Sequence, residues 1–156
     1  MNRYIIEPLA AHDRGAFDSG SDELDRYFRE RITQDMKRRV TAGFVAVGPD
    51  GDIAGFYTLA PTSLEFGALP PERAKRLPRY PVVPAILLGR LAVAIAHQGA
   101  RLGSALVADA LTRCDRLEIG GYALVVDAKD DAAARFYERL GFEPLPSSRN
   151  RLIRPL

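Results

Sequence analysis

The sequence predicts a single mixed α/β domain that spans residues 1–156. Strand-like and helix-like segments alternate along the chain in the order βα-ββ-loop-βα-βα-β. A chain of 156 residues can bury one sizeable core and is too short for two comfortable domains. Two almost uninterrupted apolar segments, residues 85–93 and 122–127, are typical of central strands in a sheet that is covered on both faces.

The N-terminal part of the chain predicts a strand and a helix. We expect a strand at residues 3–9. Ser21 is a favourable N-cap, because a serine side chain can accept a hydrogen bond from a free N–H group of the first helical turn. The helix expected over residues 22–39 carries apolar residues at helical spacing, namely Leu24, Tyr27, Phe28, Ile32 and Met36.

A hairpin and a proline-rich segment are expected next. The turn sequence Gly-Pro-Asp-Gly-Asp at residues 48–52 lies between two strand-like segments, residues 43–47 and 53–59, which is a strong hairpin signal. Between Pro61 and Pro84 prolines recur, and we expect a long surface loop with room for a short helix. Long loops in compact domains are often functional.

The C-terminal part predicts two helices and a closing pair of strands. A helix over residues 102–117 follows the first apolar segment. Asp130 is expected to cap a helix that follows the second apolar segment and ends at Gly141, since glycine favours the left-handed position that stops a helix. Residues 142–145 and 151–156 remain for a hairpin or edge strands.

A glycine-containing turn precedes the first of these two helices. Residues 98–104 have the sequence Gln-Gly-Ala-Arg-Leu-Gly-Ser. A tight turn at a helix N-terminus presents backbone N–H groups and the positive end of the helix dipole, which together suit a pyrophosphate. The sequence has neither the P-loop pattern nor the pattern Gly-x-Gly-x-x-Gly, so another kind of phosphate site is indicated.

A second block, from Asp130 to Phe142, has the sequence Asp-Asp-Ala-Ala-Ala-Arg-Phe-Tyr-Glu-Arg-Leu-Gly-Phe. Together with the turn, this block resembles the GNAT superfamily of acyl-CoA N-acyltransferases. The resemblance implies the GNAT fold, with a mixed central sheet flanked by helices, and acetyl-CoA as cosubstrate. The cofactor-binding residues that it implies are Leu91, Ala92, Val93, Gln98, Gly99, Ala100, Arg101, Leu102, Gly103 and Ser104.

Arg101 departs from the pattern of this superfamily, which usually has glycine at that position of the turn. A negative φ at this position would tolerate the arginine, and its guanidinium could add a phosphate contact. A positive φ would favour glycine, and the affinity for CoA would suffer. We expect the tolerated case, with a negative φ.

Three further segments narrow the resemblance. Residues 17–28, 55–60 and 88–93 are similar to the acetyltransferase toxins of bacterial type II toxin–antitoxin systems. That likeness implies acetylation of the α-amino group of aminoacyl-tRNA, and hence a block of translation. It also implies a ribbon-helix-helix antitoxin as partner and a possible homodimer.

Tyr137 is the candidate general acid of the transfer reaction. The substrate amine attacks the thioester, backbone N–H groups near residues 91–93 stabilise the oxyanion, and the leaving thiolate takes a proton from the phenol. The alternative is that Tyr137 is a core aromatic, because Ala133, Phe136 and Leu140 share the apolar side of its helix.

No strong general base stands out in the sequence. A free α-amino group titrates near ~7.7–8.0 and lysine near ~10.4. The ester on the adjacent carboxyl withdraws electrons and lowers the amine's pKa further, so aminoacyl-tRNA presents a largely neutral nucleophile without help. Glu65 and Asp127 could act as bases toward a lysine substrate, although solvated or structural roles are expected for both.

Arginines are unevenly distributed in a chain whose net charge is only +2. One cluster falls within residues 26–39 and another within residues 73–79, and a solvated face is the alternative to a nucleic-acid contact. Arg90 lies inside an apolar strand and therefore needs a partner, either a carboxylate or a substrate phosphate. The candidate tRNA-binding residues are Arg38, Arg39, Arg76, Arg79 and Arg90.

Other features exclude several classes of function. His12 and His97 are the two histidines and Cys114 the one cysteine, so no metal site is expected. His97 could touch phosphate, although a surface role is expected, and Cys114 should be a buried, inert thiol. No run of eighteen apolar residues and no leader segment is present, which predicts a cytoplasmic protein without a membrane contact.

Two alternatives to the tRNA-acetylating toxin remain open. One is a GNAT enzyme that acts on a small amine or on a protein N-terminus, against which the basic clusters argue mildly. The other is a largely non-catalytic co-repressor that acts with an antitoxin and has lost turnover through Arg101.

Overall fold

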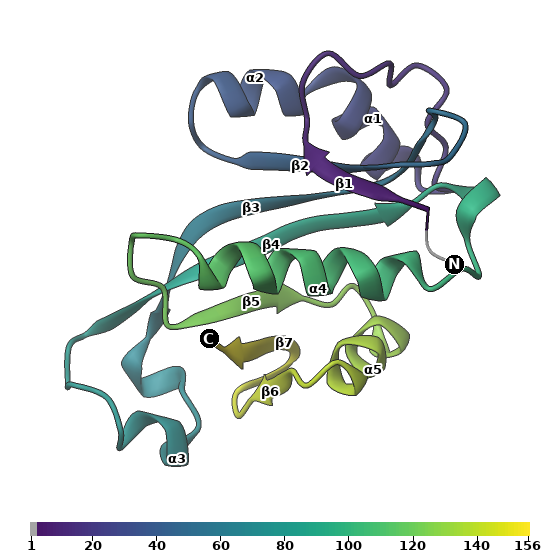
Figure 1. The fold of residues 1–156 in the computed structure, drawn as a ribbon. Helices are drawn as coiled ribbons and strands as arrows, with labels where there is room; N and C mark the ends of the chain where they lie inside the picture. Colours follow the sequence, from purple (N-terminus) through teal and green to yellow (C-terminus); the bar gives the residue numbers. More distant parts are fainter. Residues whose placement is uncertain (1–2) are drawn as a thin grey trace. The chain divides into compact units, whose positions relative to one another are not determined.

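The structure, a computed structural model, describes residues 3–156. The chain divides into two compact units, one made of the residues up to 60 together with 89–110, the other of residues 61–88 and 111–156. The described strands form one mixed sheet in the order β1-β2-β3-β4-β5-β7-β6 (Figure 1). The mixed α/β class with flanking helices is therefore confirmed.

The first unit begins with an antiparallel arrangement of strands. β1 (Ile5–Pro8) pairs with β2 (Ala42–Val47), which in turn pairs with β3 (Ile53–Glu65). The predicted hairpin between β2 and β3 is confirmed. Its turn is closed by the N–H group of Gly48, which donates to the carbonyl of Asp52 at 2.8 Å, and Gly51 has a φ of 84°.

The helix predicted over residues 22–39 is two helices, α1 (Asp22–Glu30) and α2 (Ile32–Lys37). Ser21 caps α1 as predicted, since its side chain accepts from the N–H group of Leu24. The chain departs from helical geometry at Arg31, with φ −121° and ψ −30°. Across this bend the hydroxyl of Tyr27 donates to Asp35 at 2.8 Å, a bond between residues that a straight helix would hold about 12 Å apart along its axis.

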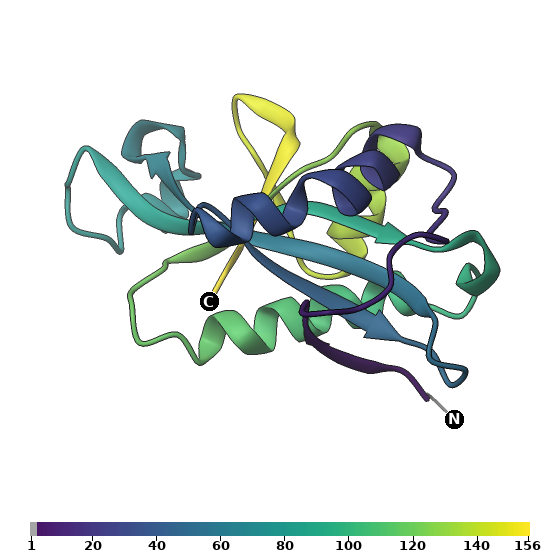
Figure 2. The same cartoon turned by 90° about the horizontal axis from the view of Figure 1, so that it is seen from above.

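Successive side chains of β3 point to opposite faces of the sheet, and they build the core of the first unit. Phe56 stacks on Phe28 of α1 at 4.3 Å between ring centroids. Its neighbours face α4 (Leu102–Asp115): the Tyr57 hydroxyl donates to Asp109, and a Cβ on Gly55 would come within 3.1 Å of Leu106. Within this unit, α1–α2 and the first turns of α4 thus cover opposite faces of the strands (Figure 2).

The proline-rich segment is more ordered than predicted. The strands on either side are longer, because β3 continues to Glu65 and β4 (Val82–Val93) begins before Pro84. Between them lie a 3₁₀ turn (Phe66–Ala68) and the short helix α3 (Pro71–Ala74). Apolar side chains explain the difference, since Leu64, Leu69 and Val83 are buried in the core of the second unit and prolines alone do not make a segment a loop.

The second unit contains the remaining elements: β5 (Ala123–Asp127), α5 (Asp131–Arg139), β6 (Glu143–Leu145) and β7 (Ser148–Pro155). β5 pairs in parallel with β4 and antiparallel with β7. Both predicted ends of α5 are confirmed: the Asp130 side chain accepts from the N–H group of Ala133 at 2.8 Å, and Gly141 has a φ of 92°.

Candidate active site

The phosphate turn, which we define as residues 98–104, links a 3₁₀ turn (Ile95–His97) at the end of β4 to the first turn of α4. Gly99 and Arg101 both have positive φ, 89° and 60° respectively. The expected negative φ at Arg101 is therefore wrong. A left-handed conformation costs a residue with a Cβ atom about 1–2 kcal/mol, so the contacts around the turn must impose it.

Backbone N–H groups are the donors that this turn offers. The carbonyl of Arg101 accepts from the N–H group of Ala105, so Arg101 stands at the start of α4. The N–H groups of Leu102, Gly103 and Ser104 belong to the first helical turn and have no partner within the helix. Together with the dipole of a 14-residue helix, they have the chemistry that suits a pyrophosphate.

Gln98 holds the turn in place through its side chain. Its amide nitrogen donates to the carbonyls of Ser19 at 3.2 Å and Val93 at 3.1 Å, and its backbone N–H donates to Ile95. All of its donor hydrogens are occupied by these bonds. In this conformation Gln98 acts on the position of the turn and leaves phosphate contacts to the backbone that follows.

His97 is bonded through both ring nitrogens. Nε2 donates to Asp52 at 2.6 Å, and the Tyr4 hydroxyl bonds with Nδ1 at 2.9 Å. The side chain of His97 is only 14% exposed, and both of its ring nitrogens contact protein side chains. The hydrogen bond from His97 lowers the pKa of the Asp52 carboxyl.

The end of β4 is the candidate for oxyanion stabilisation. Leu88 is paired with Val126 of β5, and β5 ends at the next residue, Asp127. β4 continues to Val93, so its last residues extend beyond β5. Ala92 is buried there, and Leu91 and Val93 are half-buried. The sequence predicted that backbone N–H groups of these residues stabilise the oxyanion, and this stays a prediction.

Tyr137 lies on α5, in the other unit. It is buried, and its ring makes edge contacts with those of Phe136 at 5.1 Å and Phe142 at 5.4 Å. Burial raises the pKa of the Tyr137 phenol to about 12. The phenol therefore stays protonated at neutral pH, as a proton donor must, while its packing also satisfies the core interpretation.

Arg90 lies against an aromatic ring, and its predicted contact with a substrate phosphate stays a prediction. Its guanidinium carbon lies 3.5 Å from the centre of the Tyr27 ring. Burial and the hydrogen bond to Asp35 raise the pKa of Tyr27 to about 12, against the opposing charge of Arg90. A guanidinium that lies over an aromatic ring keeps N–H donors that can bind a ligand.

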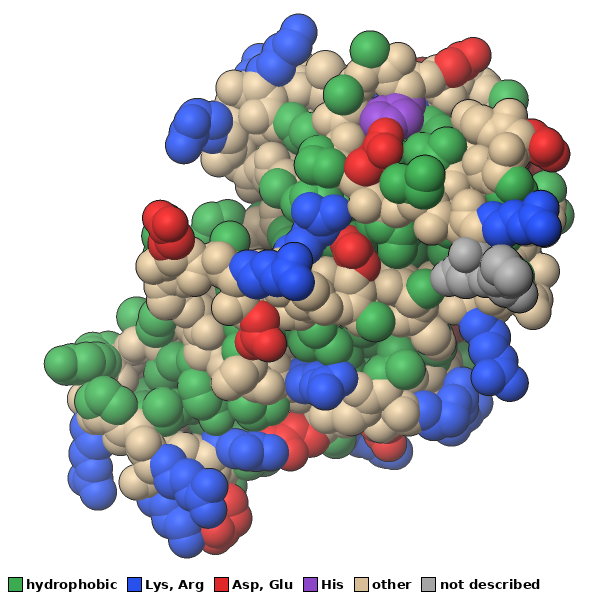
Figure 3. Space-filling view, viewed as in Figure 1, with side chains coloured by type: hydrophobic (Ala, Val, Ile, Leu, Met, Phe, Trp, Pro, Cys, Tyr) green, Lys and Arg blue, Asp and Glu red, His purple; other side chains and the backbone are tan. Residues whose placement is uncertain are grey.

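The predicted tRNA-binding arginines on the surface fall in both units. Arg38 and Arg39 follow α2, where Arg39 has a φ of 61° and the N–H group of Val40 donates to the backbone carbonyl of Asp35 in a Schellman motif. Arg76 and Arg79 follow α3 and are exposed. Figure 3 shows basic side chains gathered around α3. Ion pairs in that region join Arg73 to Glu143 and Lys75 to Glu72.

The remaining candidates have structural surroundings. Asp127 pairs with Arg151 at 3.3 Å, and Glu65 is exposed at the end of β3. Cys114 is buried, and burial raises the pKa of its thiol to about 11, in agreement with the predicted inert role. Over residues 3–156 no cluster of metal-ligating side chains occurs, and none of the helices in that range has the length and apolarity to span a bilayer.

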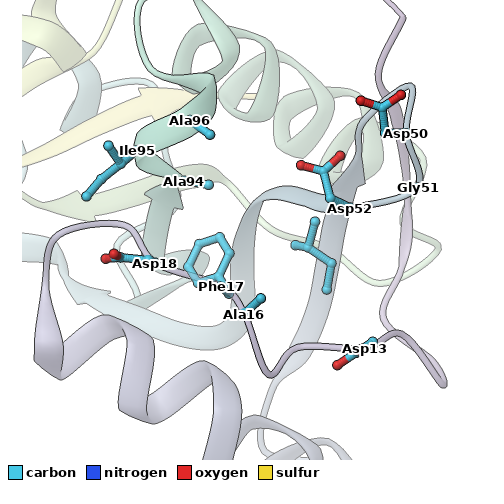
Figure 4. A pocket seen from close by; sticks show the side chains of 11 residues that line it. Asp13, Ala16, Phe17, Asp18, Asp50, Gly51, Asp52, Ala94, Ile95 and Ala96 are labelled. Atoms are coloured by element: carbon cyan, nitrogen blue, oxygen red, sulfur yellow. The ribbon is translucent and has the colours of Figure 1, made fainter.

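An acidic pocket in the first unit was missed by sequence reasoning. It has a volume of about 590 Å³ and lies between the β2–β3 hairpin, the chain before α1 and the 3₁₀ turn after β4. Figure 4 shows four carboxylates around it, those of Asp13, Asp18, Asp50 and Asp52. Such a lining repels phosphate. The carboxylates are spread over forty residues of sequence without a pattern, so no local signal could have found them.

The turn before α4 and the block that carries Tyr137 both lie within the part of the chain that matches a known family. A family model described as "Acetyltransferase (GNAT) domain" matches residues 39–144. The chain belongs to the GNAT acetyltransferase family and is an N-acetyltransferase that uses acetyl-CoA.

Relatives within this family are toxins. The chain is 38% identical over 139 residues to a "tRNA-acetylating toxin" of Mycobacterium tuberculosis, covering 88% of this chain and 82% of the relative. It is 27% identical to a "Probable toxin TacT" of Sinorhizobium fredii, covering 97% of this chain and 91% of the relative.

Solved structures of toxins have the same fold. A tyrosine-to-phenylalanine mutant of KacT superposes with a TM-score of 0.89 at 31% identity, covering 99% of this chain and 95% of the other. AtaT complexed with acetyl-methionyl-tRNAfMet superposes with a TM-score of 0.88 at 30% identity, covering 97% and 94%.

Proposed function

We propose that this enzyme is a toxin that transfers the acetyl group of acetyl-CoA to the α-amino group of aminoacyl-tRNA and so blocks translation. The observation that carries the proposal is the 38% identity, over 88% of this chain, to a tRNA-acetylating toxin. The likeness to AtaT, whose structures include complexes with acetyl-methionyl-tRNAfMet and with acetyl-CoA, supports it.

The roles of the site residues follow from their chemistry. The N–H groups of residues 102–104 bind the pyrophosphate of CoA, and backbone donors near residues 91–93 stabilise the oxyanion that forms when the amine attacks the thioester. Tyr137 then donates its phenolic proton to the departing thiolate, the attacking nitrogen releases a proton to solvent, and the phenolate regains one from solvent. A dedicated base is unnecessary, because the ester on the adjacent carboxyl lowers the pKa of the α-amino group below the ~7.7–8.0 of a free α-amino group.

Basic side chains supply the contacts to the nucleic acid. Arg38 and Arg39 in one unit, and Arg76 and Arg79 in the other, are exposed and offer charge to phosphates. Arg90, whose guanidinium carbon lies over the Tyr27 ring, is a further candidate for contact with the tRNA.

Several partner and context proposals accompany this function. We propose one GNAT domain over residues 1–156, a cytoplasmic location, a ribbon-helix-helix antitoxin and a homodimer. Structures of AtaT with the C-terminus of its antitoxin AtaR, and of a KacTA–DNA complex, support an antitoxin partner. They also favour a second role, in which the toxin and its antitoxin together bind DNA.

A direct assay tests the proposed function. Purified enzyme is incubated with labelled acetyl-CoA and, in parallel, with a mixture of aminoacyl-tRNAs, a polyamine and a peptide with a free N-terminus. Label is expected in the aminoacyl-tRNA fraction, and alkaline hydrolysis of the ester should release it as N-acetyl amino acid. Label confined to the polyamine or the peptide would reject the tRNA substrate while keeping the acetyltransferase.

A further inference from the structure

We propose that Tyr4, His97 and Asp52 form a positioning relay that holds the phosphate turn in the shape that binds acetyl-CoA. The inference rests on the proposed use of this turn for the pyrophosphate. It assigns a role to three side chains that lie outside the turn, and it predicts an effect on the affinity for acetyl-CoA without an effect on the chemical step.

The relay is anchored in the first strands of the fold. His97 is the last residue before the phosphate turn, Asp52 lies in the turn of the β2–β3 hairpin, and Tyr4 lies directly before β1. Asp52 and His97 are 45 positions apart in the chain, and Tyr4 and His97 are 93 apart. The contact therefore ties the start of the turn to two distant segments of the same unit.

The chemistry of the three groups fixes the orientation of the imidazole. An ionised carboxylate only accepts hydrogen bonds, so the Nε2 atom of His97 must carry the proton that Asp52 receives at 2.6 Å. In the tautomer with its proton on Nε2, the ring accepts at Nδ1 from the hydroxyl of Tyr4, at 2.9 Å. The Tyr4 ring also meets the imidazole edge-on, with centroids 5.4 Å apart, so the histidine is held on two sides.

Close packing around the pair shows how tightly it is placed. A Cβ atom on Gly48 would lie 2.7 Å from a carboxylate oxygen of Asp52 and 3.1 Å from Cε1 of His97. Glycine at this corner of the hairpin therefore lets the pair sit against the backbone. The Gly48 N–H group also donates to the backbone carbonyl of Asp52. This bond fixes the backbone of the residue that carries the carboxylate.

A second clamp acts on the next residue of the chain. Gln98 donates to the carbonyls of Ser19 and Val93. Ser19 is itself held by the buried carboxylate of Asp25, which accepts from both its backbone N–H and its hydroxyl. The entrance of the phosphate turn is thus fixed through His97 on one side and Gln98 on the other.

The turn needs such clamps because its own sequence does not favour its shape. Arg101 adopts a φ of 60°, a conformation that a residue with a Cβ atom rarely takes without constraint. Loosening the entrance should let the turn relax toward other conformations and misalign the N–H groups that bind phosphate. The misalignment should then lower the affinity for acetyl-CoA. An effect on affinity is what we expect from a residue that positions the binding groups.

The test uses conservative variants of the relay in the full chain. Asp52→Asn, His97→Gln and Tyr4→Phe each remove one hydrogen bond or one partner. We expect the KM for acetyl-CoA to rise about three- to tenfold, the range of one ordinary hydrogen bond, with kcat within about twofold and the KM for aminoacyl-tRNA unchanged.

The matched control is His12→Gln. His12 also pairs with a carboxylate, that of Glu7 at 2.7 Å, in the same unit. The variant His12→Gln should leave all kinetic parameters unchanged. An equal rise in the KM for acetyl-CoA in His12→Gln and His97→Gln would overturn the proposal. Calorimetric titration of acetyl-CoA onto each variant gives the affinity without turnover.

Other outcomes would also reject the relay. An unchanged affinity in Asp52→Asn and Tyr4→Phe would show that the pair is ordinary surface structure, and a fall in kcat at constant KM would place it in the chemical step. If His97→Gln does not fold, the other two variants decide. Failure of the wild-type enzyme to bind acetyl-CoA is a different result, which would reject the proposed function itself.

Discussion

The chain passes from strand to helix after β4 and again after β5, and the two junctions are built on different principles. The junction into α5 follows local rules: Asp130 caps the helix with its side chain, and Gly141 ends it with a positive φ. The junction into α4 breaks them, because Arg101 takes a left-handed conformation and contacts with distant segments hold the turn.

The difference reflects what each junction has to do. A helix whose first N–H groups are satisfied by a capping side chain cannot offer them to a ligand. Asp130 occupies the N–H group of Ala133, whereas the N–H groups of residues 102–104 are the ones that we propose bind phosphate. The α5 junction places a side chain, Tyr137, and the α4 junction exposes backbone. A backbone site cannot be stabilised by its own caps and depends on tertiary contacts.

Loss of the Tyr137 hydroxyl should have the largest effect. Tyr137→Phe keeps the buried ring and removes only the proton donor, so kcat should fall by about 10²–10⁴-fold with little change in acetyl-CoA affinity. Steady-state kinetics with titration of acetyl-CoA measures both quantities. Tyr122→Phe, a half-buried tyrosine of the same unit, is the control. Wild-type turnover in Tyr137→Phe would leave this residue with a core role alone.

A negative charge introduced into the first turn of α4 should have the second-largest effect. Gly103→Glu adds bulk and a negative charge beside the pyrophosphate, and we expect at least a roughly tenfold weaker affinity for acetyl-CoA. Ala108→Glu adds the same side chain at an exposed position further along the helix and should bind normally. Isothermal titration calorimetry makes the comparison. Equal affinities for the two variants would remove the turn from the cosubstrate site.

The basic clusters should affect the other substrate. Replacing Arg38 and Arg39, or Arg76 and Arg79, by glutamine should weaken tRNA binding and leave acetyl-CoA binding intact. Each lost phosphate contact should make the slope of log affinity against log salt shallower by about 0.7–0.9.

The control for these pairs replaces Arg116 and Arg149, which are exposed and lie outside both clusters. Filter binding across a salt series gives the slopes. If all three double variants share the slope of the wild type, the arginines of the two clusters are a solvated face.

The two junctions also differ in how well the sequence predicted their structure. The cap at Asp130, the stop at Gly141 and the hairpin at residues 48–52 depend on neighbours in the chain, and all were predicted. The φ of Arg101 depends on tertiary contacts, and the prediction failed there.

The other features that the sequence analysis did not predict also depend on tertiary contacts. The partner of Arg90 is a ring on α1, which brings together residues far apart in sequence. The bend at Arg31 allows Tyr27 to reach Asp35, although the apolar spacing continues through it as in a single helix. The carboxylates of the acidic pocket follow no period at all. Local rules therefore predict elements and caps, and the contacts between elements must come from the structure.

The smallest effect should come from removing the strain itself. Arg39 and Arg101 are the two non-glycine residues with positive φ in the described part of the chain. Glycine removes the steric cost at either position and loses more entropy on folding, so each replacement should raise the free energy of unfolding by at most about 1 kcal/mol. Urea unfolding measures this gain. Arg39 lies in a Schellman motif at the end of α2, so Arg39→Gly is the reference for strain relief away from the phosphate turn.

Arg101→Gly should differ from this reference in one respect. If the clamps at His97 and Gln98 already hold the turn, relief of strain should improve acetyl-CoA affinity by no more than about threefold, a few tenths of a kcal/mol. Arg39→Gly should leave that affinity unchanged. A large gain, of tenfold or more, would mean that the arginine distorts the turn and that wild-type turnover is limited by it, which is the co-repressor alternative. A loss of affinity would instead mean that the guanidinium itself binds phosphate, so that its charge outweighs the strain of its backbone.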